Sequence, residues 1–323
     1  MKRVILLVFA TITLASCNDK PVLITDSAGK MNDILVVIED DLWDGVVGDS
    51  IRKVLAADVD VLTRPEPLFT LNQVKPAAFN GMLRKSRNYL RVDHSGNQPA
   101  DVKVTNNLHA NPQKGVVVHG SSDEDIINQV IEKSDLIKRV FKEHEIKEKQ
   151  RLIDRVALNV DRIKEKLGVT LKVPQAYRYA ALDDPEFFWL RRNIREGTMD
   201  IMLFEVPREA ILKENVALSI VKVRDSIGAL KIPVDEGGVF QTEPAYSPFV
   251  NESAINGVFT YETKGLWEVK NKFMSGPFLN YAIYNEKRDS WIIAEGYIYA
   301  PSAAQRNYLF ELEAILRSIR FVD

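Results

Sequence analysis

A long helical pattern in the middle of the chain constrains the fold more than any other feature of this sequence. Ser122 is followed by three acids, which suits the start of a helix because carboxylates stabilise its positive end. Helical spacing then runs on to Gly168, and its last apolar residues step by three and four: Ile153, Val156, Val160, Ile163 and Leu167. An unbroken helix of this length would span roughly 65 Å. We therefore expect helical stretches that belong to different halves of the molecule.

The centre of this helical pattern is strongly charged. Residues 142–151, KEHEIKEKQR, contain a single apolar residue, Ile146. Two arrangements fit this composition: a solvated helical bridge between two bodies, or a turn between two antiparallel helices. We expect the charged centre, including His144, to lie in water. A dimeric coiled coil fits less well, because the pattern holds fewer than three clean heptads.

Strand patterns lie on both sides of the helical segment. The apolar run Ile34–Ile38 predicts a buried strand, and Asp40 or Asp41 can cap the helix after it. Residues 64–76 contain three prolines and predict loop or edge structure. Further strands are expected at 88–92, 115–118, 170–173, 187–191, 201–206, 257–263, 279–285 and 291–299, and helices at 215–230 and 303–319. Because strands and helices do not alternate strictly, we predict an α+β fold of two halves, with mainly antiparallel sheets flanked by helices.

The two halves repeat one order of elements. In each half a strand precedes a helix that contains Asp-Ser-Ile, at residues 49–51 and 225–227. Each half also ends with a strand that leads into a long helix. An internal duplication is therefore one hypothesis, although so short a match is weak by itself.

Composition excludes several classes of protein. The chain has 323 residues, of which 46% are apolar and 27% charged, which is typical of a globular protein and not of a disordered one. Its 43 basic and 45 acidic residues nearly balance, whereas a nucleic-acid-binding protein needs a strongly basic face. We therefore expect no nucleic-acid partner. The single cysteine excludes a disulfide scaffold and a thiolate metal site.

That cysteine ends a segment typical of a bacterial lipoprotein signal. Lys2 and Arg3 precede the apolar run 4–12, which is too short to cross a bilayer, and Leu-Ala-Ser-Cys follows at 14–17. Small residues before Cys17 would let a peptidase reach the backbone, and the thiol would accept a diacylglycerol. Two or three acyl chains make an anchor that does not readily dissociate. An ordinary cleaved secretory signal is the alternative, but the only cysteine stands at the required position.

These patterns divide the chain into four parts. We expect residues 1–16 to be a signal peptide and residues 17–30 to be a lipidated tether, because the latter are polar and poor in apolar residues. The N-terminal α+β half would cover 31–168 and end in the long helix, and the β-rich C-terminal half would cover 169–323. No other stretch approaches the length of a transmembrane helix.

A search for chemistry finds no catalytic motif. His94, His109 and His119 could hold a zinc ion with an open fourth position, but their spacing matches no ligand motif. The sequence has no G-x-S-x-G, S-x-x-K, H-E-x-x-H or phosphate-binding loop. We therefore expect no catalytic residues, no metal and no cofactor, and an enzyme is the less favoured alternative.

Aromatic residues and arginines are concentrated in the second half. Trp189 lies beside Arg191 and Arg192, and Tyr297 and Tyr299 fall on one face of the last strand. Most such residues belong to a sheet core, yet a surface of aromatic and arginine side chains could also engage a protein, glycan or peptide. We therefore name these five residues as a possible interaction surface.

Several blocks of the sequence resemble an uncharacterised family of Bacteroidota lipoproteins, domain of unknown function 4837. The resemblance covers nearly all of the mature chain and rests on GKMN at 29–32, DLW at 41–43, VGDSIR at 47–52, PEPLF at 65–69, RN at 87–88 and FWLRR at 188–192. It implies an envelope lipoprotein of a Gram-negative cell at the outer membrane, and it carries over no catalytic residues. Asp19 is the only acid in residues 18–21, and surface-exported lipoproteins of this phylum tend to carry an acidic cluster there. We therefore expect the periplasmic face.

Together these observations predict a lipid-anchored envelope protein that serves as a non-catalytic binding or scaffold accessory. Its expected partners are the membrane, through Cys17, and another envelope protein. The alternative is a ligand-binding protein or enzyme with a cleft between the two halves.

Overall fold

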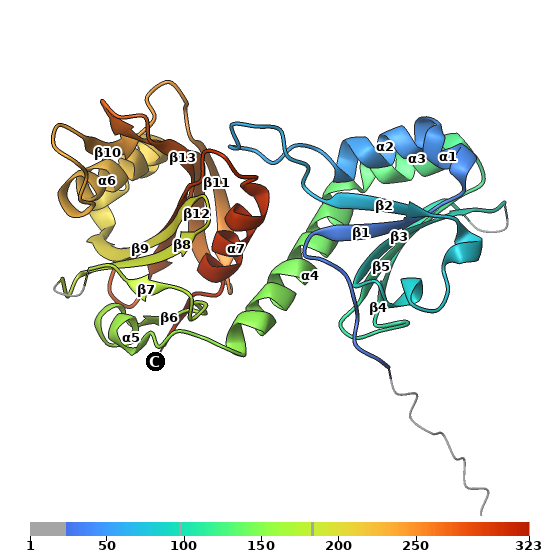
Figure 1. The fold of residues 1–323 in the computed structure, drawn as a ribbon, viewed down its shortest axis with the longest axis horizontal. Coiled ribbons are helices and arrows are strands. Elements are labelled where there is room, and N and C mark those ends of the chain that lie inside the picture. The colour runs from blue at the N-terminus through green and yellow to red at the C-terminus, as the bar shows by residue number, and fades with distance from the viewer. Residues whose placement is uncertain (1–23, 97–98, 182–183, 323) are drawn as a thin grey trace, which may run out of the picture.

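The computed structural model describes residues 24–96, 99–181 and 184–322. Cys17 and the expected signal peptide lie outside these residues. The chain forms two bodies, which are joined along a long central helix, α4 (Ser134–Asp154) (Figure 1). None of the helices in the described ranges is long and apolar enough to cross a membrane.

The N-terminal body is built on a five-stranded sheet of order β2-β1-β3-β5-β4. The three inner strands are mostly buried, and β1 and β5 are rich in β-branched residues, as expected for parallel strands covered on both faces. The pairs β1–β2, β1–β3 and β3–β5 are parallel, and β4 adds an antiparallel edge. The strands are β1 (Asp33–Val37), β2 (Thr70–Val74), β3 (Asn88–His94), β4 (Asp101–Asn106) and β5 (Lys114–Gly120).

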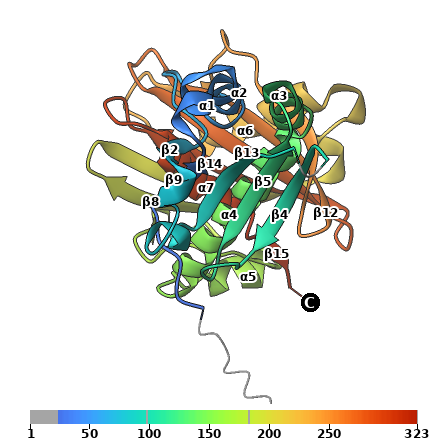
Figure 2. The ribbon, with the colours of Figure 1, turned by 90° about the vertical axis from the view of Figure 1, so that its right-hand side faces the viewer.

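Helices cover one face of this sheet and a loop covers part of the other. Figure 2 shows α1 (Asp40–Asp44), α2 (Val46–Leu55) and α3 (Asp123–Glu132) above the strands, with the first described residues leaving at the bottom. The helices bury Val47, Ile51 and Ile126 against the sheet. On the opposite face Phe79 packs on Tyr89, between the short 3-10 helices η1 (Pro76–Ala78) and η2 (Leu83–Lys85).

The central helical pattern forms three helices. α3 begins where the sequence predicted a helix, and Ser122 caps it by accepting a hydrogen bond from the amide of Asp125. α4 follows at once, and α5 (Asp161–Leu167) begins only after a break and ends at Gly168 in a left-handed conformation, φ 66°. The expectation of helix through Val156 and Val160 is wrong, because Leu158 there pairs with Val173 through a backbone hydrogen bond of 2.8 Å. Leu158 and Val160 pack against the C-terminal core, whereas Val156 is 59% exposed, and we call residues 155–160 the strap.

The C-terminal body is an eight-stranded antiparallel sheet of order β10-β12-β13-β14-β9-β8-β7, with β11 also paired to β12. Its strands are β7 (Arg178–Tyr179), β8 (Phe187–Ile194), β9 (Gly197–Pro207), β10 (Val239–Thr242), β11 (Phe249–Ile255), β12 (Val258–Lys270), β13 (Ser275–Asn285) and β14 (Ser290–Tyr299). Two short strands, β6 (Val169–Thr170) and β15 (Arg320–Phe321), form a separate pair.

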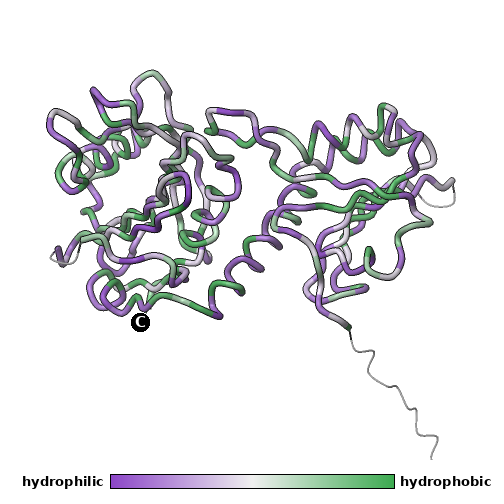
Figure 3. The backbone as a smooth tube through the Cα atoms, viewed as in Figure 1, coloured by the Kyte–Doolittle hydropathy of each residue, from purple (hydrophilic) through white to green (hydrophobic). Residues whose placement is uncertain are grey.

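Each face of the large sheet has its own core. α7 (Arg306–Leu316) and α5 pack on one face, and α6 (Val216–Lys231), preceded by η3 (Arg208–Ala210) and η4 (Lys213–Asn215), covers the other. Along β14, Tyr297 and Tyr299 face α6 while Ile298 faces α7, as the alternation predicted. Apolar segments coincide with these strands in Figure 3, and hydrophilic residues dominate the middle of α4.

The predicted α+β class is confirmed, and antiparallel pairing dominates the molecule. The N-terminal sheet departs from that expectation, because it is mainly parallel. The two sheets also differ in strand order, so the similarity that suggested a duplication does not extend to their topology.

Candidate functional site

The charged centre of α4 is not in water, contrary to our expectation. α4 crosses the amino-terminal ends of β1 and β3, where Glu145 is completely buried. Its carboxylate accepts hydrogen bonds from the Arg87 guanidinium at 2.6 Å, the Asn88 side-chain amide at 2.7 Å and the Asn32 backbone amide at 2.6 Å. Arg87 also donates to the carbonyl oxygens of Gly29 and Lys30. A buried charge is tolerated here because it is paired and fully hydrogen-bonded.

His144 is buried beside this cluster, so its expected position on a solvated face is also wrong. Its Nδ1 lies 2.8 Å from Asn88 Oδ1. Burial lowers the pKa of His144 to about 4, against a smaller opposing effect of Glu145. The neutral imidazole is therefore the form that the fold accommodates.

The opposite side of α4 contacts α7 of the C-terminal body. Lys142 pairs with Glu313 at 2.8 Å, Lys149 with Glu311 at 2.6 Å, and Arg317 with Glu143 at 2.6 Å. Ile146, the only apolar residue of the charged segment, packs among Phe310 and Ala314 between these ion pairs. α4 thus holds the two bodies together with both of its sides.

A second connection runs from the N-terminal body to the C-terminal core. The loop after α2, residues 56–68, which we call the arm, places Val61 at 5% exposure within the core beneath α7. Val61 adopts φ 72°, a left-handed conformation that a β-branched residue avoids. Such strain costs of order 1–3 kcal/mol and persists only when surrounding contacts impose it.

Glu66 of the arm caps the start of α7. Its two carboxylate oxygens accept hydrogen bonds from the backbone amides of Gln305 at 2.7 Å and Arg306 at 2.9 Å. A carboxylate at this position satisfies amides that have no partner within the helix and stabilises its positive end. Pro65 and Pro67 flank Glu66, and the Pro67 carbonyl accepts a hydrogen bond from Arg306 Nη1 at 3.0 Å.

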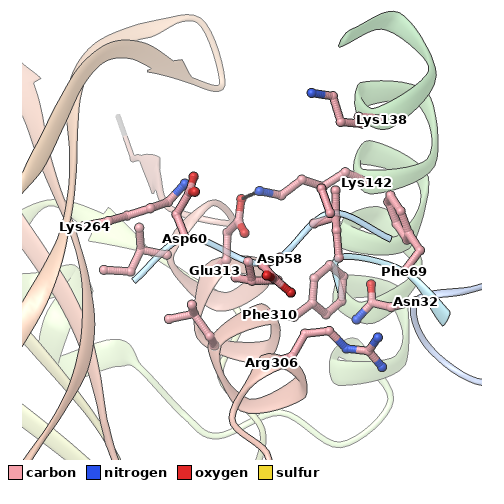
Figure 4. Close-up of a pocket in the computed structure, with 15 residues that line it drawn as sticks. Asn32, Asp58, Asp60, Phe69, Lys138, Lys142, Lys264, Arg306, Phe310 and Glu313 are labelled. Atoms are coloured by element: carbon pink, nitrogen blue, oxygen red, sulfur yellow. Dashed lines mark ion pairs between the residues drawn. The ribbon is translucent and has the colours of Figure 1, made fainter. Parts of the chain in front are cut away.

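A cleft of about 360 Å³ opens between the arm, α4, α7 and strand β12. Figure 4 shows cationic side chains approaching it from both bodies, Lys138 and Lys142 from α4, Lys264 from β12 and Arg306 from α7. Acidic side chains reach it from the arm and α7, and apolar side chains complete its wall: Asp58, Asp60 and Glu313, then Leu68, Phe69, Leu279, Leu309 and Phe310.

The cations of the cleft differ in how completely they are neutralised. Lys142 pairs with Glu313, and Lys264 pairs with Glu262 at 2.7 Å. Burial disfavours the charged form of Lys264, but attraction to Glu262, Glu313 and Asp60 outweighs it and raises the pKa of Lys264. Among the residues that the structure describes, Lys138 pairs with Asp135 alone, at 3.0 Å, and this carboxylate is 93% exposed and so shields it weakly.

The aromatic surface expected from the sequence does not form. Trp189 and Tyr297 are 5% and 2% exposed and belong to the core under α6, so their assignment to a surface is wrong. Tyr299 packs partly buried against the same core. Alternation along the antiparallel strands turned these rings inward, because α6 covers that face.

Arg191 and Arg192 are brought to opposite faces of β8. Arg191 pairs with the buried Asp200 at 2.7 Å and stacks over Trp189 at 4.5 Å. Arg192 pairs with Glu311 of α7 at 2.5 Å. Both therefore stabilise the body instead of forming one exposed patch.

The three histidines considered for a metal site are dispersed. His94 lies 3.4 Å from Asp123 and His119 lies 3.3 Å from Asp93, both at the carboxyl ends of β3 and β5. His109 lies at the other end of the sheet against Phe79 and Tyr89. Within the described ranges, no group of three His, Cys, Asp or Glu side chains is placed to hold a metal ion.

The core under α6 contains a buried polar cluster that the sequence did not indicate. Arg224 is 1% exposed, donates to Glu295 at 2.9 Å and lies over the Phe278 ring at 4.0 Å. Burial raises the pKa of Glu295, although Arg224 and Asn280 oppose this. These residues come from α6, β13 and β14, and only pairing of the strands brings them together.

The residues that line the cleft could not be identified from the sequence either. They come from six separate segments of the chain, and no motif connects them. The one available signal was the proline-rich arm, whose block 65–69 was among the family blocks.

Comparison with known proteins gives a family and a weak structural similarity. No significantly similar protein is found among the curated proteins. The chain is 12% identical to the Ran-binding protein Mog1p of Saccharomyces cerevisiae, with a TM-score of 0.33, over 48% of this chain and 91% of that one. A point mutant of protein Mog1 gives 12% identity and a TM-score of 0.30, over 48% of this chain and 92% of that one.

Two protein families match consecutive parts of the chain. Residues 27–154 match Domain of unknown function (DUF8532). Residues 157–318 match Domain of unknown function (DUF4837). The division falls at the end of α4, where the chain passes to the strap and α5. The chain thus belongs to the family named Domain of unknown function (DUF4837).

Proposed function

We propose that this protein is an envelope lipoprotein, anchored by acyl chains on Cys17 at the outer membrane and facing the periplasm. The proposal is supported by the signal-like segment that ends at the only cysteine and by the polar residues after it. The anchored body acts as a non-catalytic binding accessory of a cell-envelope process.

The cleft between the two bodies is the proposed binding site. The single observation that carries this step is the convergence of Lys138, Lys142, Lys264 and Arg306 on one cavity from elements of both bodies. Lys138, whose carboxylate partner Asp135 is exposed, and Arg306, which donates to the Pro67 carbonyl and to Thr70 Oγ1, are the cations best placed to receive an acidic group. The apolar side chains of Phe69, Leu309 and Phe310 offer contact to a carbon skeleton. The proposed ligand is a small molecule with a carboxylate or phosphate group and an apolar part.

The cleft favours binding over catalysis. The described residues that line it include no histidine, cysteine, serine, threonine or tyrosine. Lysine can act as a nucleophile when its pKa is lowered, but the pKa of Lys264 is raised, which keeps its amine protonated. The remaining candidates for a general base are the carboxylates of Asp58, Asp60 and Glu313, and Glu313 is already paired with Lys142.

Anchoring is tested by replacing Cys17. In the native cell, Cys17→Ala should move the protein from the membrane to the soluble fraction and abolish incorporation of labelled palmitate. Ser16→Ala is the matched control, because it keeps the thiol and a small residue before it. Membrane retention of Cys17→Ala would overturn the lipid anchor.

Ligand binding is tested by native mass spectrometry of protein released gently from its own membranes. A bound small acid should add a discrete mass, which Lys138→Ala reduces and Arg139→Ala, an exposed neighbour outside the cleft, leaves unchanged. Equal loss from both variants would overturn the cleft as the site. Crosslinking of the same preparation tests for an envelope protein partner, and a reproducible partner with an empty cleft would favour a scaffold role.

A further inference from the structure

The chain enters the N-terminal body through a segment that is bonded to two loops. The amide of Ala28 donates to the Lys85 carbonyl at 2.8 Å, and the amide of Asn111 donates to the Thr25 carbonyl at 3.0 Å. Gln113 joins the two loops, because its Nε2 donates to the carbonyl oxygen of Ser86 at 2.8 Å and to that of Arg84. Residues 24–30, 80–86 and 106–114 therefore form one continuous surface, which we call the entry face.

The entry face exposes large apolar side chains from all three of its segments. Ile24 is 48% exposed, Met82 69%, Leu83 37% and Leu108 59%. They stand at the end of the sheet where β3 and β5 begin, on the side from which the first described residues leave the body (Figure 2). Exposed apolar side chains gathered at one place mark a contact with a protein or a membrane.

The charge of the entry face is opposite to that of the whole chain. Its segments contain the cations Lys30, Arg84, Lys85 and Lys114 and a single carboxylate, that of Asp26, whereas the chain has a formal net charge of −2. Cations around exposed apolar side chains are the combination that binds the surface of an anionic bilayer.

The length of the preceding chain limits how far this face can be from the membrane. Cys17 precedes Ile24 by seven residues, which span at most about 25 Å when fully extended. An acylated Cys17 would therefore keep the entry face within that distance of the lipid headgroups.

We propose that the entry face lies on the surface of an anionic bilayer, with Met82 and Leu108 inserted among the headgroups. This inference rests on the lipid anchor proposed above and adds a second point of contact to it. An acyl chain on a tether leaves the orientation of a protein free, whereas contact through the entry face fixes it. The cleft and α7 would then be presented at a defined angle to the membrane.

The test uses the mature chain with Cys17→Ser, which contains no other cysteine. A histidine tag at residue 17 holds the protein on vesicles of phosphatidylethanolamine and phosphatidylglycerol that contain a nickel-chelating lipid. Single cysteines at Met82→Cys or Leu108→Cys carry a polarity-sensitive fluorophore, and Leu230→Cys on the C-terminal body, 74% exposed, is the matched control. The emission at 82 and 108 should rise severalfold and shift to the blue on vesicles, while that at 230 stays unchanged.

Charge variants test the electrostatic part. Combined Arg84→Glu and Lys85→Glu should reduce the response at position 108 severalfold, and Lys222→Glu, exposed on α6, should not. An equal response at 82, 108 and 230, or no response at any of them, would overturn the proposal. Because the chelating lipid replaces the natural anchor, this result does not depend on lipidation of Cys17, which the Cys17→Ala variant tests separately.

Discussion

The two sides of α4 carry the same kinds of residue in different environments. On one side His144 and Glu145 lie 7% and 0% exposed against the ends of β1 and β3. On the other side Glu143 is 40% exposed where it pairs with Arg317 of the C-terminal body. In the sequence these three residues are consecutive.

The difference shows that neighbouring charges on one helix can have unequal energetic roles. Breaking a buried pair leaves an uncompensated charge in a medium of low polarity, whereas an exposed pair exchanges its partner for water. The buried side packs α4 on the N-terminal sheet, and the partly exposed ion pairs of the other side join α4 to α7. The following predictions test this division.

The largest effect is expected from Glu145→Ala. It leaves Arg87 buried without a counter-ion and removes the acceptor of Asn32 and Asn88, so the free energy of unfolding should fall by about 3–5 kcal/mol. Urea unfolding of the purified protein measures this loss. If Glu145→Ala lowers the free energy of unfolding no more than Glu143→Ala does, the buried cluster does not hold α4 on the N-terminal sheet.

A pH dependence centred on His144 is the next largest expected effect. Its pKa in the fold is lowered to about 4 from the usual 6.5, mainly by burial, with Arg87 and Lys114 adding to the shift and Glu145 and Glu148 opposing it. Between these values the unfolded chain binds more protons than the folded one, so stability falls as the pH falls. From pH 7 to pH 5 the loss at this site is about 2 kcal/mol.

The measurement compares unfolding at pH 7 and pH 5 in the wild type and in His144→Gln. The variant should lose this part of the pH dependence, while His94→Gln, at an exposed histidine, should retain it. If both variants keep the wild-type slope, the neutral buried imidazole is not the cause.

A moderate effect is expected from Glu66→Ala, which acts on α7 without touching α4. The variant removes the acceptor of the amides of Gln305 and Arg306, and loss of such a cap costs about 0.5–2 kcal/mol. The rate of hydrogen exchange of the backbone amides at the start of α7 should also increase in this variant. Glu66→Gln keeps an acceptor oxygen and should lose less, and equal losses would mean that the carboxylate does not act as a cap.

The smallest effect is expected from Glu143→Ala. Its pair with Arg317 is partly exposed, and Arg317 also lies 3.6 Å from Glu313, so the cost should be about 0–1 kcal/mol. The same urea unfolding as for Glu145→Ala provides the comparison. A cost near that of Glu145→Ala would contradict the division of α4 into two unlike sides.

The strands and helices with clear periodicity were predictable. Ile34–Ile38 corresponds to β1, α3 begins after Ser122 as expected, and the strands expected at 279–285 and 291–299 are β13 and β14. Short or polar edge strands such as β4 (Asp101–Asn106) and β11 were not recognised, because alternation is weak where neither face is fully covered. The parallel order of the N-terminal sheet also followed from pairing between distant segments.

The cleft and the buried clusters could not be predicted. The partners of Glu145 lie 57 to 113 residues away, and Glu66 caps a helix 239 residues further along the chain. Local propensity carries no information about such contacts. The inward position of Trp189 and Tyr297 likewise depended on which face α6 covers.

The sequence by itself determined the α+β class, the family and most of the regular elements, because periodicity and local motifs are properties of neighbouring residues. Tertiary structure alone decided which charges are buried, where the arm inserts and which cations meet in the cleft. The physical reason is that burial and pairing depend on surfaces contributed by distant segments. Glu143 and Glu145 are two residues apart and chemically identical, yet only the packing of α4 gives one a partly exposed partner and the other a partner in the core.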